Sequence, residues 1–382
     1  MTIQFPVCSR LIHLNHAAVG VWPQVTVEAV KAFAEENALT GSLNYPHWMK
    51  VEKKLRGQLA ELINAASVEE IALVKNTSEG LSFVAYGLPW QAGENVVGIQ
   101  QEFPSNRFVW ESLSSKGVEF RKLDMHSTQD PEQSLFDLCD ANTRLISISA
   151  VQYHNGFRMD LKKIGDFCRR HSILFCVDAI QQLGALEFDV QSIGADFVIA
   201  DGHKWLLSAE GLGVFYVRRA VIDQLQVLQY GWHMVEQLAD YTAEGFELAS
   251  GARRFECGSP NMLGIHALQA SLDLLLSTGM QNIQLQVLDN SRYLIQGLSA
   301  IQGIRVMTDA REERLSGIVT FQSDKPAAQQ MYRLLMERGI LCAARGGGVR
   351  LSPHFYTPRD QLEKALSLIE DLVKSESDQN TD

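Results

Sequence analysis

Short apolar runs alternate with longer amphipathic stretches between residues 71 and 217. The apolar runs have the length of buried strands and are rich in β-branched and aromatic residues. They lie at 71–74, 96–99, 145–151, 173–177, 197–200 and 214–217. Apolar residues at helical spacing mark the intervening segments 81–88, 108–115 and 161–171. This alternation predicts an α/β fold in which helices cover both faces of a largely parallel sheet.

The pattern differs on either side of this series. Helical spacing marks residues 25–33 and 51–63 before it. After about residue 260 we expect helices at 262–276, 283–298, 327–338 and 361–373, and strands at 304–306, 317–321 and 340–343. The sequence therefore predicts a large α/β domain over residues 16–260 and a smaller α+β domain formed by residues 1–15 with 261–382.

Composition excludes several classes of function. A chain of 382 residues with 46% hydrophobic content can form two cores. Its net charge of −11 argues against a nucleic-acid partner, and no stretch of membrane-spanning length is uniformly apolar. The first residues lack the basic and apolar regions of a signal peptide. The six cysteines are scattered without a Cys-x-x-Cys pair, which predicts reduced thiols in the cytoplasm and no structural metal site.

Polar residues follow the predicted strands at the points where those strands end. They are residues 76–78, 102–104, 152–153, 178 and 203–204. The carboxyl ends of parallel strands meet at one edge of a sheet, and ligands bind at that edge. We therefore expect these residues to line a single pocket.

Lys204 follows the buried strand at 197–200, directly after His203. A buried ammonium group is costly unless it is paired or neutralised. Lys204 is therefore either a surface lysine whose stem lies on apolar residues, or a lysine of lowered pKa that can form a Schiff base.

The other strand ends also allow two interpretations each. Thr77 and Ser78 can cap a helix or bind an anion at its start. Asp178 can cap the next helix or keep a pyridinium nitrogen protonated. Phe103 can belong to the core or stack on a planar ring.

Taken together, several separated motifs resemble the class V aminotransferase family. These fold-type I pyridoxal-phosphate enzymes include cysteine desulfurases, kynureninase and isopenicillin N epimerase. The motifs are Val177-Asp178-Ala179-Ile180-Gln181, Gly194-Ala195-Asp196-Phe197, Gly202-His203-Lys204-Trp205 and the segment 210–218. The resemblance extends from Asn15 to Thr357. It implies a mostly parallel seven-stranded sheet and a pyridoxal 5'-phosphate cofactor.

By this resemblance, four residues would hold the ring of the cofactor. Lys204 would form the Schiff base and move the proton at the substrate Cα. Asp178 would pair with the pyridine nitrogen, and Gln181 would reach the phenolic oxygen. Phe103 would stack on the ring.

The resemblance also implies a phosphate site surrounded by Thr77, Ser78, His203 and Asp201. Many relatives have Ser in place of Asp201, so its contact with the phosphate is left open. Ser259 lies in the segment 255–261, which matches a family segment that reaches the phosphate of a partner subunit. A homodimer with shared active sites is therefore implied.

Arg350 matches the arginine that binds the substrate carboxylate in this family. A planar guanidinium suits such two-pronged binding better than an ammonium group does. Asn15 and His16 would line the substrate side of the pocket. The expected partner is thus a small α-amino acid.

One feature of cysteine desulfurases is missing from this sequence. Those enzymes carry a nucleophilic cysteine on a loop between an Arg-x-Gly and the carboxylate arginine, whereas residues 345–350 run through without such a loop. Cys342 precedes them in a strand-like run, and we interpret it as a small buried hydrophobe. Persulfide-forming desulfurase chemistry is therefore disfavoured.

We expect a pyridoxal-phosphate enzyme that removes the Cα proton of an amino acid, first of all an aminotransferase. A C–S lyase that eliminates sulfur from cysteine or cystine, and an amino-acid epimerase, share that first step and remain alternatives. A non-catalytic relative would lack Lys204, Asp178 or Arg350, and all three are present. A dinucleotide-dependent oxidoreductase would need a Gly-x-Gly-x-x-Gly after an early strand, which this sequence lacks.

Overall fold

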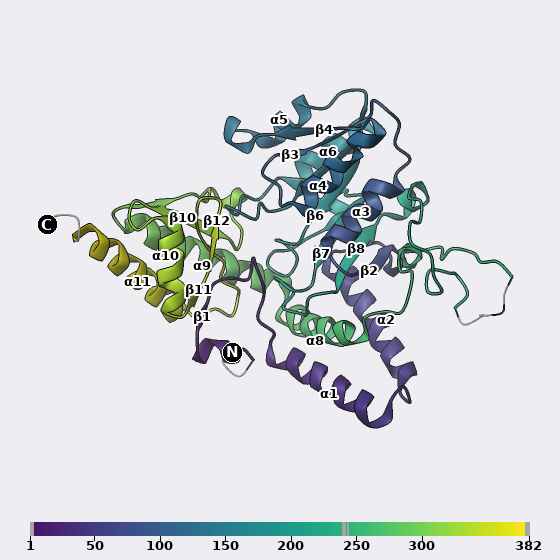
Figure 1. The fold of residues 1–382 in the computed structure, drawn as a ribbon, viewed down its shortest axis with the longest axis horizontal. Coiled ribbons are helices and arrows are strands. Elements are labelled where there is room, and N and C mark those ends of the chain that lie inside the picture. Colours follow the sequence, from purple (N-terminus) through teal and green to yellow (C-terminus); the bar gives the residue numbers. More distant parts are fainter. Residues whose placement is uncertain (1–3, 239–241, 243, 379–382) are drawn as a thin grey trace.

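A seven-stranded sheet forms the larger part of the computed structural model, which describes residues 4–238, 242 and 244–378 (Figure 1). Its order is β2 (Ile71–Val74), β8 (Gly213–Val217), β7 (Phe197–Asp201), β6 (Leu174–Asp178), β5 (Thr143–Ser149), β3 (Asn95–Ile99) and β4 (Glu119–Leu123). Strand β8 runs antiparallel to both of its neighbours, and the other pairs are parallel. The predicted α/β class with a mostly parallel sheet is confirmed.

Alternate residues of each strand enter two separate cores, because successive side chains point to opposite faces of a sheet. On one face Phe197 and Ile199 pack with Phe83 of α3 (Thr77–Gly87). On the other face Val198 and Ala200 belong to a core that α2, α6 and α8 complete. Burial on both faces explains why these strands are continuous apolar runs in the sequence.

The remaining helices around this sheet vary in length. They are α1 (Gln24–Thr40), α2 (Tyr45–Leu62), α4 (Ser105–Glu111), α5 (Pro131–Asp137), α6 (Leu161–His171), α7 (Val190–Ile193) and α8 (Met262–Thr278). Short 3₁₀ turns lie at Pro6–Ser9, Val68–Glu70, Ser112–Lys116, Met125–Ser127, Arg219–Gln224, Ala252–Phe255 and Glu312–Arg314. Helix α8 packs against α1 and α2 (Figure 1).

A four-stranded antiparallel sheet forms the smaller part, in the order β12 (Ala343–Arg345), β13 (Gly348–Leu351), β10 (Val319–Ser323) and β9 (Ile304–Val306). Three helices accompany it: α9 (Met280–Ala300), α10 (Ala328–Glu337) and α11 (Arg359–Asp378). The predicted smaller α+β unit is therefore present. None of the described helices is long and apolar enough to cross a membrane.

The N-terminal segment joins the two parts. Strand β1 (Ile12–His13) pairs in parallel with β11 (Ile340–Leu341), and Asn15 then forms a bridge with Ser352. A few residues later the Gly20 N–H donates to the His203 carbonyl oxygen at 2.7 Å. A Cβ at Gly20 would lie 2.0 Å from the Lys204 carbonyl oxygen, so this approach requires glycine.

Two strands were not expected from the sequence. Strand β4 lies at the edge of the large sheet and is mostly half-exposed or exposed, so it lacks an apolar run. Strand β13 is buried, but it follows two glycines of positive φ that end β12 in a tight turn. The single strand expected at 340–343 is divided between β11 and β12, which belong to different sheets.

Candidate active site

A cavity of about 240 Å³ opens at the carboxyl ends of β6 and β7 and reaches the strand β13 of the smaller part. It brings together most of the residues expected from the strand ends. The lining residues are Ala17, Ala18, Thr77, Ser78, Phe103, Ser105, Tyr153, Asp178, Ile180, Gln181, Asp201, His203, Lys204, Arg345 and Arg350. The one-pocket arrangement expected from the strand ends is thus present in the structure.

Lys204 lies in this cavity and is buried, with 9% of its surface exposed. Burial lowers its pKa to about 8, and the nearby Arg350 and Arg345 act in the same direction. Asp178 and Asp201 oppose this shift by attracting the ammonium charge. A sizeable neutral fraction near neutral pH suits an amine that acts as a nucleophile or a base.

Asp178 ends strand β6 and is buried. Its Oδ1 accepts the Ile180 N–H at 3.0 Å. Burial raises its pKa to about 6, while this hydrogen bond and Lys204 counteract the rise. A carboxylate in such a setting is stabilised by a protonated ring nitrogen, which a pyridine cofactor would supply.

The Gln181 side chain is held in place from two sides. Its Nε2 donates to the Ala17 carbonyl oxygen at 3.0 Å, and its Oε1 accepts the Trp205 indole N–H at 2.8 Å. A primary amide has a second N–H, so Gln181 keeps one donor for a ligand oxygen.

Phe103 forms a wall of the cavity. Its ring is 42% exposed, and its centroid lies 5.6 Å from Lys204 Nζ and 5.3 Å from the Tyr153 ring. The preceding Glu102 is buried and accepts from the Ser149 N–H at 2.6 Å and from Gln152 Nε2 at 3.1 Å. These bonds fix the loop, so the phenyl ring is available to stack on a planar group.

The end of the cavity at the start of α3 has unused hydrogen-bonding groups. The buried atoms Thr77 Oγ1, Asp201 Oδ1 and His203 Nδ1 have no partner in the structure. Ser78 donates to Ser105 Oγ at 2.8 Å. Buried polar atoms normally have partners, so Thr77 Oγ1, His203 Nδ1 and the helix N-terminus fit a phosphate group, whereas a charged Asp201 would repel it. The residues present therefore fit the cofactor that the family resemblance implies.

Arg350 brings a cation to the opposite side of the cavity. It is 2% exposed, its Nη1 donates to the Tyr153 carbonyl oxygen at 2.6 Å, and its Nε has no partner. Burial lowers its pKa to about 10, and Arg345 adds to the effect. A buried guanidinium is costly without an anion, so Arg350 suits the binding of a substrate carboxylate.

Asn15 and His16 do not line the cavity. His16 is fully buried, and its ring nitrogens contact the Ser352 carbonyl oxygen at 2.8 Å and Tyr356 Oη at 2.7 Å. Ala17 and Ala18 form the cavity wall at this place. His16 therefore lies beneath the cavity wall that Ala17 and Ala18 form, and supports it.

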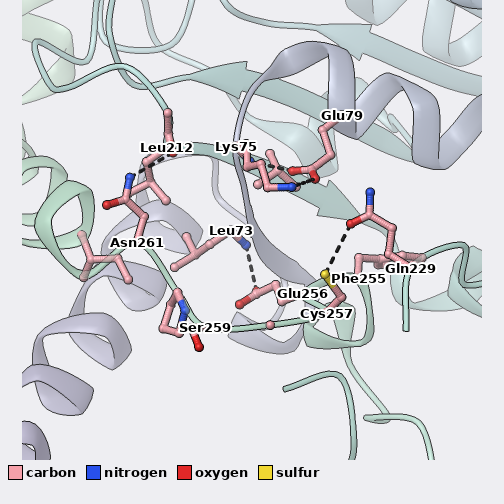
Figure 2. Close-up of a pocket in the computed structure, with 15 residues that line it drawn as sticks. Leu73, Lys75, Glu79, Leu212, Gln229, Phe255, Glu256, Cys257, Ser259 and Asn261 are labelled. Carbon is pink, nitrogen blue, oxygen red and sulfur yellow. Dashed lines mark hydrogen bonds and ion pairs between the residues drawn. The ribbon is translucent and has the colours of Figure 1, made fainter. Parts of the chain in front are cut away.

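Ser259 also lies outside this cavity. It borders a different hollow of about 220 Å³, which Gln229 and Cys257 also line (Figure 2). The neighbouring Glu256 holds this segment, because it accepts from Arg56 at 2.5 Å and from the Leu73 N–H at 2.8 Å. Within one chain the structure does not bring Ser259 to Lys204.

Sequence reasoning gave no role to three of the lining residues, Ser105, Tyr153 and Arg345. Tyr153 was expected in the pocket because it follows a strand, and the structure places it there without a role assigned to it beforehand. Arg345 lies at the end of β12 on an exposed hairpin, and no pattern in the sequence marks it.

The model of the family described as Aminotransferase class-V matches residues 12–363. A probable cysteine desulfurase of Methanothermobacter thermautotrophicus is 30% identical over 391 residues, which cover 96% of each chain. An uncharacterized aminotransferase of Bacillus subtilis, YcbU, is 28% identical over 87% of each chain.

Two solved structures share the fold. A complex of the cystine C–S lyase C-DES with its reaction product cysteine persulfide has a TM-score of 0.90 and 23% identity. The match covers 97% of this chain and all of that one. The apo cysteine desulfurase of Thermococcus onnurineus NA1 has a TM-score of 0.88 and 24% identity, over 98% of this chain and 97% of that one.

Proposed function

Because the chain belongs to the class V aminotransferase family of pyridoxal-phosphate enzymes, we propose that it is a C–S lyase acting on a cystine-type amino acid. The observation that carries this proposal is a cavity that combines the buried Lys204 with two arginines and contains no cysteine. The sequence favours transamination, whereas the names of the relatives favour the lyase alternative.

The proposed reaction is a β-elimination. The Cα proton is removed, the Cβ–S bond breaks, and the sulfur leaves with its bonding electrons. With cystine and one water molecule the products are pyruvate, ammonia and cysteine persulfide, so atoms and charge balance. When bound, pyridoxal phosphate withdraws electrons from the amino acid and so makes the Cα–H acidic.

For each step of substrate binding and proton transfer, the cavity contains a residue that could perform it. Arg350 would bind the α-carboxylate and so fix the orientation of the Cα–H bond. Lys204 would accept the Cα proton, since its lowered pKa leaves a neutral fraction near neutral pH. Asp178 and Phe103 would hold the ring of the cofactor by charge and by stacking.

The cysteines support a reaction without an enzyme-bound persulfide. All six lie in the described part of the chain, and none lines the cavity. Cys342 is 2% exposed in the core of the smaller part, and burial raises its pKa to about 12. A thiol in this state is a poor nucleophile. The free cysteines also support a reducing location such as the cytoplasm.

The function is tested by incubating the enzyme with a panel of amino acids, including cystine, cysteine, S-methylcysteine and alanine. Pyruvate, ammonia, persulfide, sulfide and pyridoxamine phosphate are measured separately. We expect pyruvate, ammonia and persulfide from cystine in equal amounts. A keto acid that forms together with pyridoxamine phosphate, without ammonia, would instead identify an aminotransferase.

Arg345 leads to a prediction about the half of cystine that lies beyond the disulfide and carries the second carboxylate. Its guanidinium is exposed at the rim and donates to the Ala344 carbonyl oxygen, so it is available to the second carboxylate of cystine. Arg345→Ala should raise KM for cystine about fivefold, since a rim charge contributes on the order of 1 kcal/mol.

S-methylcysteine is the matched control for Arg345, because it has no second carboxylate. Its KM should stay within about twofold in Arg345→Ala. An equal rise for both substrates would show that Arg345 does not select the distal group.

We further infer a homodimer with shared active sites, in which Ser259 serves the cavity of the partner subunit. The position of Ser259 in a separate hollow supports this arrangement (Figure 2). Two inactive variants, Lys204→Ala and Ser259→Asp, should regain about a quarter of the wild-type activity after mixing and subunit exchange. The reason is that half of the dimers would be hybrids with one intact site. No gain above the separate variants, in mixtures shown to exchange subunits, would contradict shared sites.

A further inference from the structure

Asp201 is an acid at the end of the cavity near the start of α3, and the family resemblance leaves its contact with a phosphate open. It ends strand β7 and is 8% exposed. Its Oδ1 has no hydrogen-bond partner, and its Oδ2 lies 3.6 Å from His203 Nδ1, which is also without a partner. Asp201 lines the cavity, while its buried Oδ1 lies against the neighbouring strand without a donor.

The carboxyl group of Asp201 packs against strand β8 on one side and lines the cavity on the other. Gly213 of β8 is its partner in the sheet register, and a Cβ there would lie 3.0 Å from Asp201 Oδ1. On the α3 side the neighbour is Thr77, whose Oγ1 is also unpartnered. Glu79, on the same helix, is instead paired with Lys75 at 3.1 Å.

The charged groups that face Asp201 do not neutralise a carboxylate. Lys204 attracts its negative charge, but Lys204 is also attracted by Asp178. Asp178 and Glu210 repel that charge, and the pKa of His203 is lowered by burial, which favours its neutral form. Burial raises the pKa of Asp201 to about 7, although the Thr77 N–H and Lys204 counteract the rise.

A phosphate group bound at the start of α3 would meet this carboxyl group. A phosphate monoester is mostly a dianion above its second pKa of about 6, and a carboxylate beside it would repel it. A protonated carboxyl group would instead donate a hydrogen bond to it. We propose that Asp201 retains a proton when the cofactor phosphate is bound and donates it to the phosphate, so that cofactor binding takes up a proton.

The inference rests on the cofactor of the family and not on the C–S lyase reaction, so either proposal can fail alone. The test measures binding of pyridoxamine 5'-phosphate to the full-length apoprotein between pH 7 and 8.5. This ligand has no aldehyde, so Schiff-base formation with Lys204 does not enter the measurement. Pyridoxamine, which lacks the phosphate, is the matched ligand and corrects for titration of Lys204 and of the ligand amine.

We expect the ratio of the two affinities, phosphate ligand over pyridoxamine, to fall as the pH rises in the wild type. The slope should approach tenfold per pH unit above pH 7, where the free protein has lost the proton of Asp201 and binding must take one up. Asp201→Asn keeps a donor but cannot titrate, and its ratio should be independent of pH. At pH 8.5 this variant should bind the phosphate ligand at least about tenfold more tightly than the wild type.

Asp201→Ser is the second variant, and it should also lose the pH dependence. Circular dichroism of each variant verifies the fold. A ratio that is independent of pH in the wild type would overturn the proposal. So would a folded Asn or Ser variant that retains the wild-type slope. The wild-type comparison is decisive even if both variants fail to fold.

Discussion

Lys204→Ala is expected to reduce the rate of β-elimination by at least about 10³-fold, since positioned acid–base groups contribute 10²- to 10⁴-fold and this residue would also hold the cofactor. Its amine is buried in the cavity, and its pKa is lowered to about 8. No other lysine lines the cavity within the described part of the chain. Steady-state kinetics with cystine gives the loss directly.

Borohydride reduction followed by peptide mapping provides a readout that does not depend on turnover. The cofactor should be trapped on the peptide that contains Lys204, and the Ala variant should show no adduct there. Lys162→Ala is the matched control, because Lys162 is exposed and pairs with Asp166 on the surface of α6. An adduct on another lysine in the wild type would contradict the assignment of Lys204 and its cavity as the cofactor site.

Arg350→Ala is expected to lower kcat/KM by roughly 30- to 5,000-fold, which corresponds to about 2–5 kcal/mol of transition-state binding. The guanidinium is 2% exposed, and its Nε has no partner, so a substrate carboxylate would form a desolvated, charge-assisted pair with it. A competitive inhibitor that has a carboxylate but no Cα proton, such as an α-methyl amino acid, should also bind this variant more weakly than the wild type.

Two further variants separate this role of Arg350 from structural damage. Arg311→Ala removes an exposed arginine that pairs with Asp309, and it should leave kcat/KM unchanged. Cys342→Ala should cost only packing in the core of the smaller part. An Arg350→Ala enzyme with near-normal kcat/KM would exclude Arg350 as the carboxylate site. If the wild type releases sulfide from cysteine and Cys342→Ala does not, the enzyme is instead a cysteine desulfurase that uses Cys342.

Much of the large sheet could be predicted from the sequence because its strands are buried on both faces. Strand β7 is an example: each of its residues is buried, so it is a continuous apolar run that ends at Asp201. Lys204 and Asp178 could be placed in the cavity for the same reason, since each follows such a strand. Strand β4 was missed because an edge strand with half-exposed, charged side chains has no comparable pattern.

Positions that depend on distant parts of the chain could not be predicted in this way. His16 lies in a sequence that suits a ligand contact, but its neighbours Ser352 and Tyr356 come from more than 330 residues away and enclose it. Arg345 reaches the cavity because Gly346 and Gly347 turn the chain with φ of 57° and 77°. Local residue patterns do not contain these tertiary contacts.

The pairing of the N-terminal segment with residues 339–352 also has a consequence for the order of folding. Residues 12–16 are synthesised first, yet their backbone partners Gly339, Leu341 and Ser352 leave the ribosome more than 300 residues later. Such long-range pairing is slow, because a very large loop must close before the contacts form. The large sheet can therefore assemble during synthesis, but residues 12–16 can pair only after β11 and β13 exist. The cavity, which includes Arg345 and Arg350, is likewise complete only when translation has passed these residues.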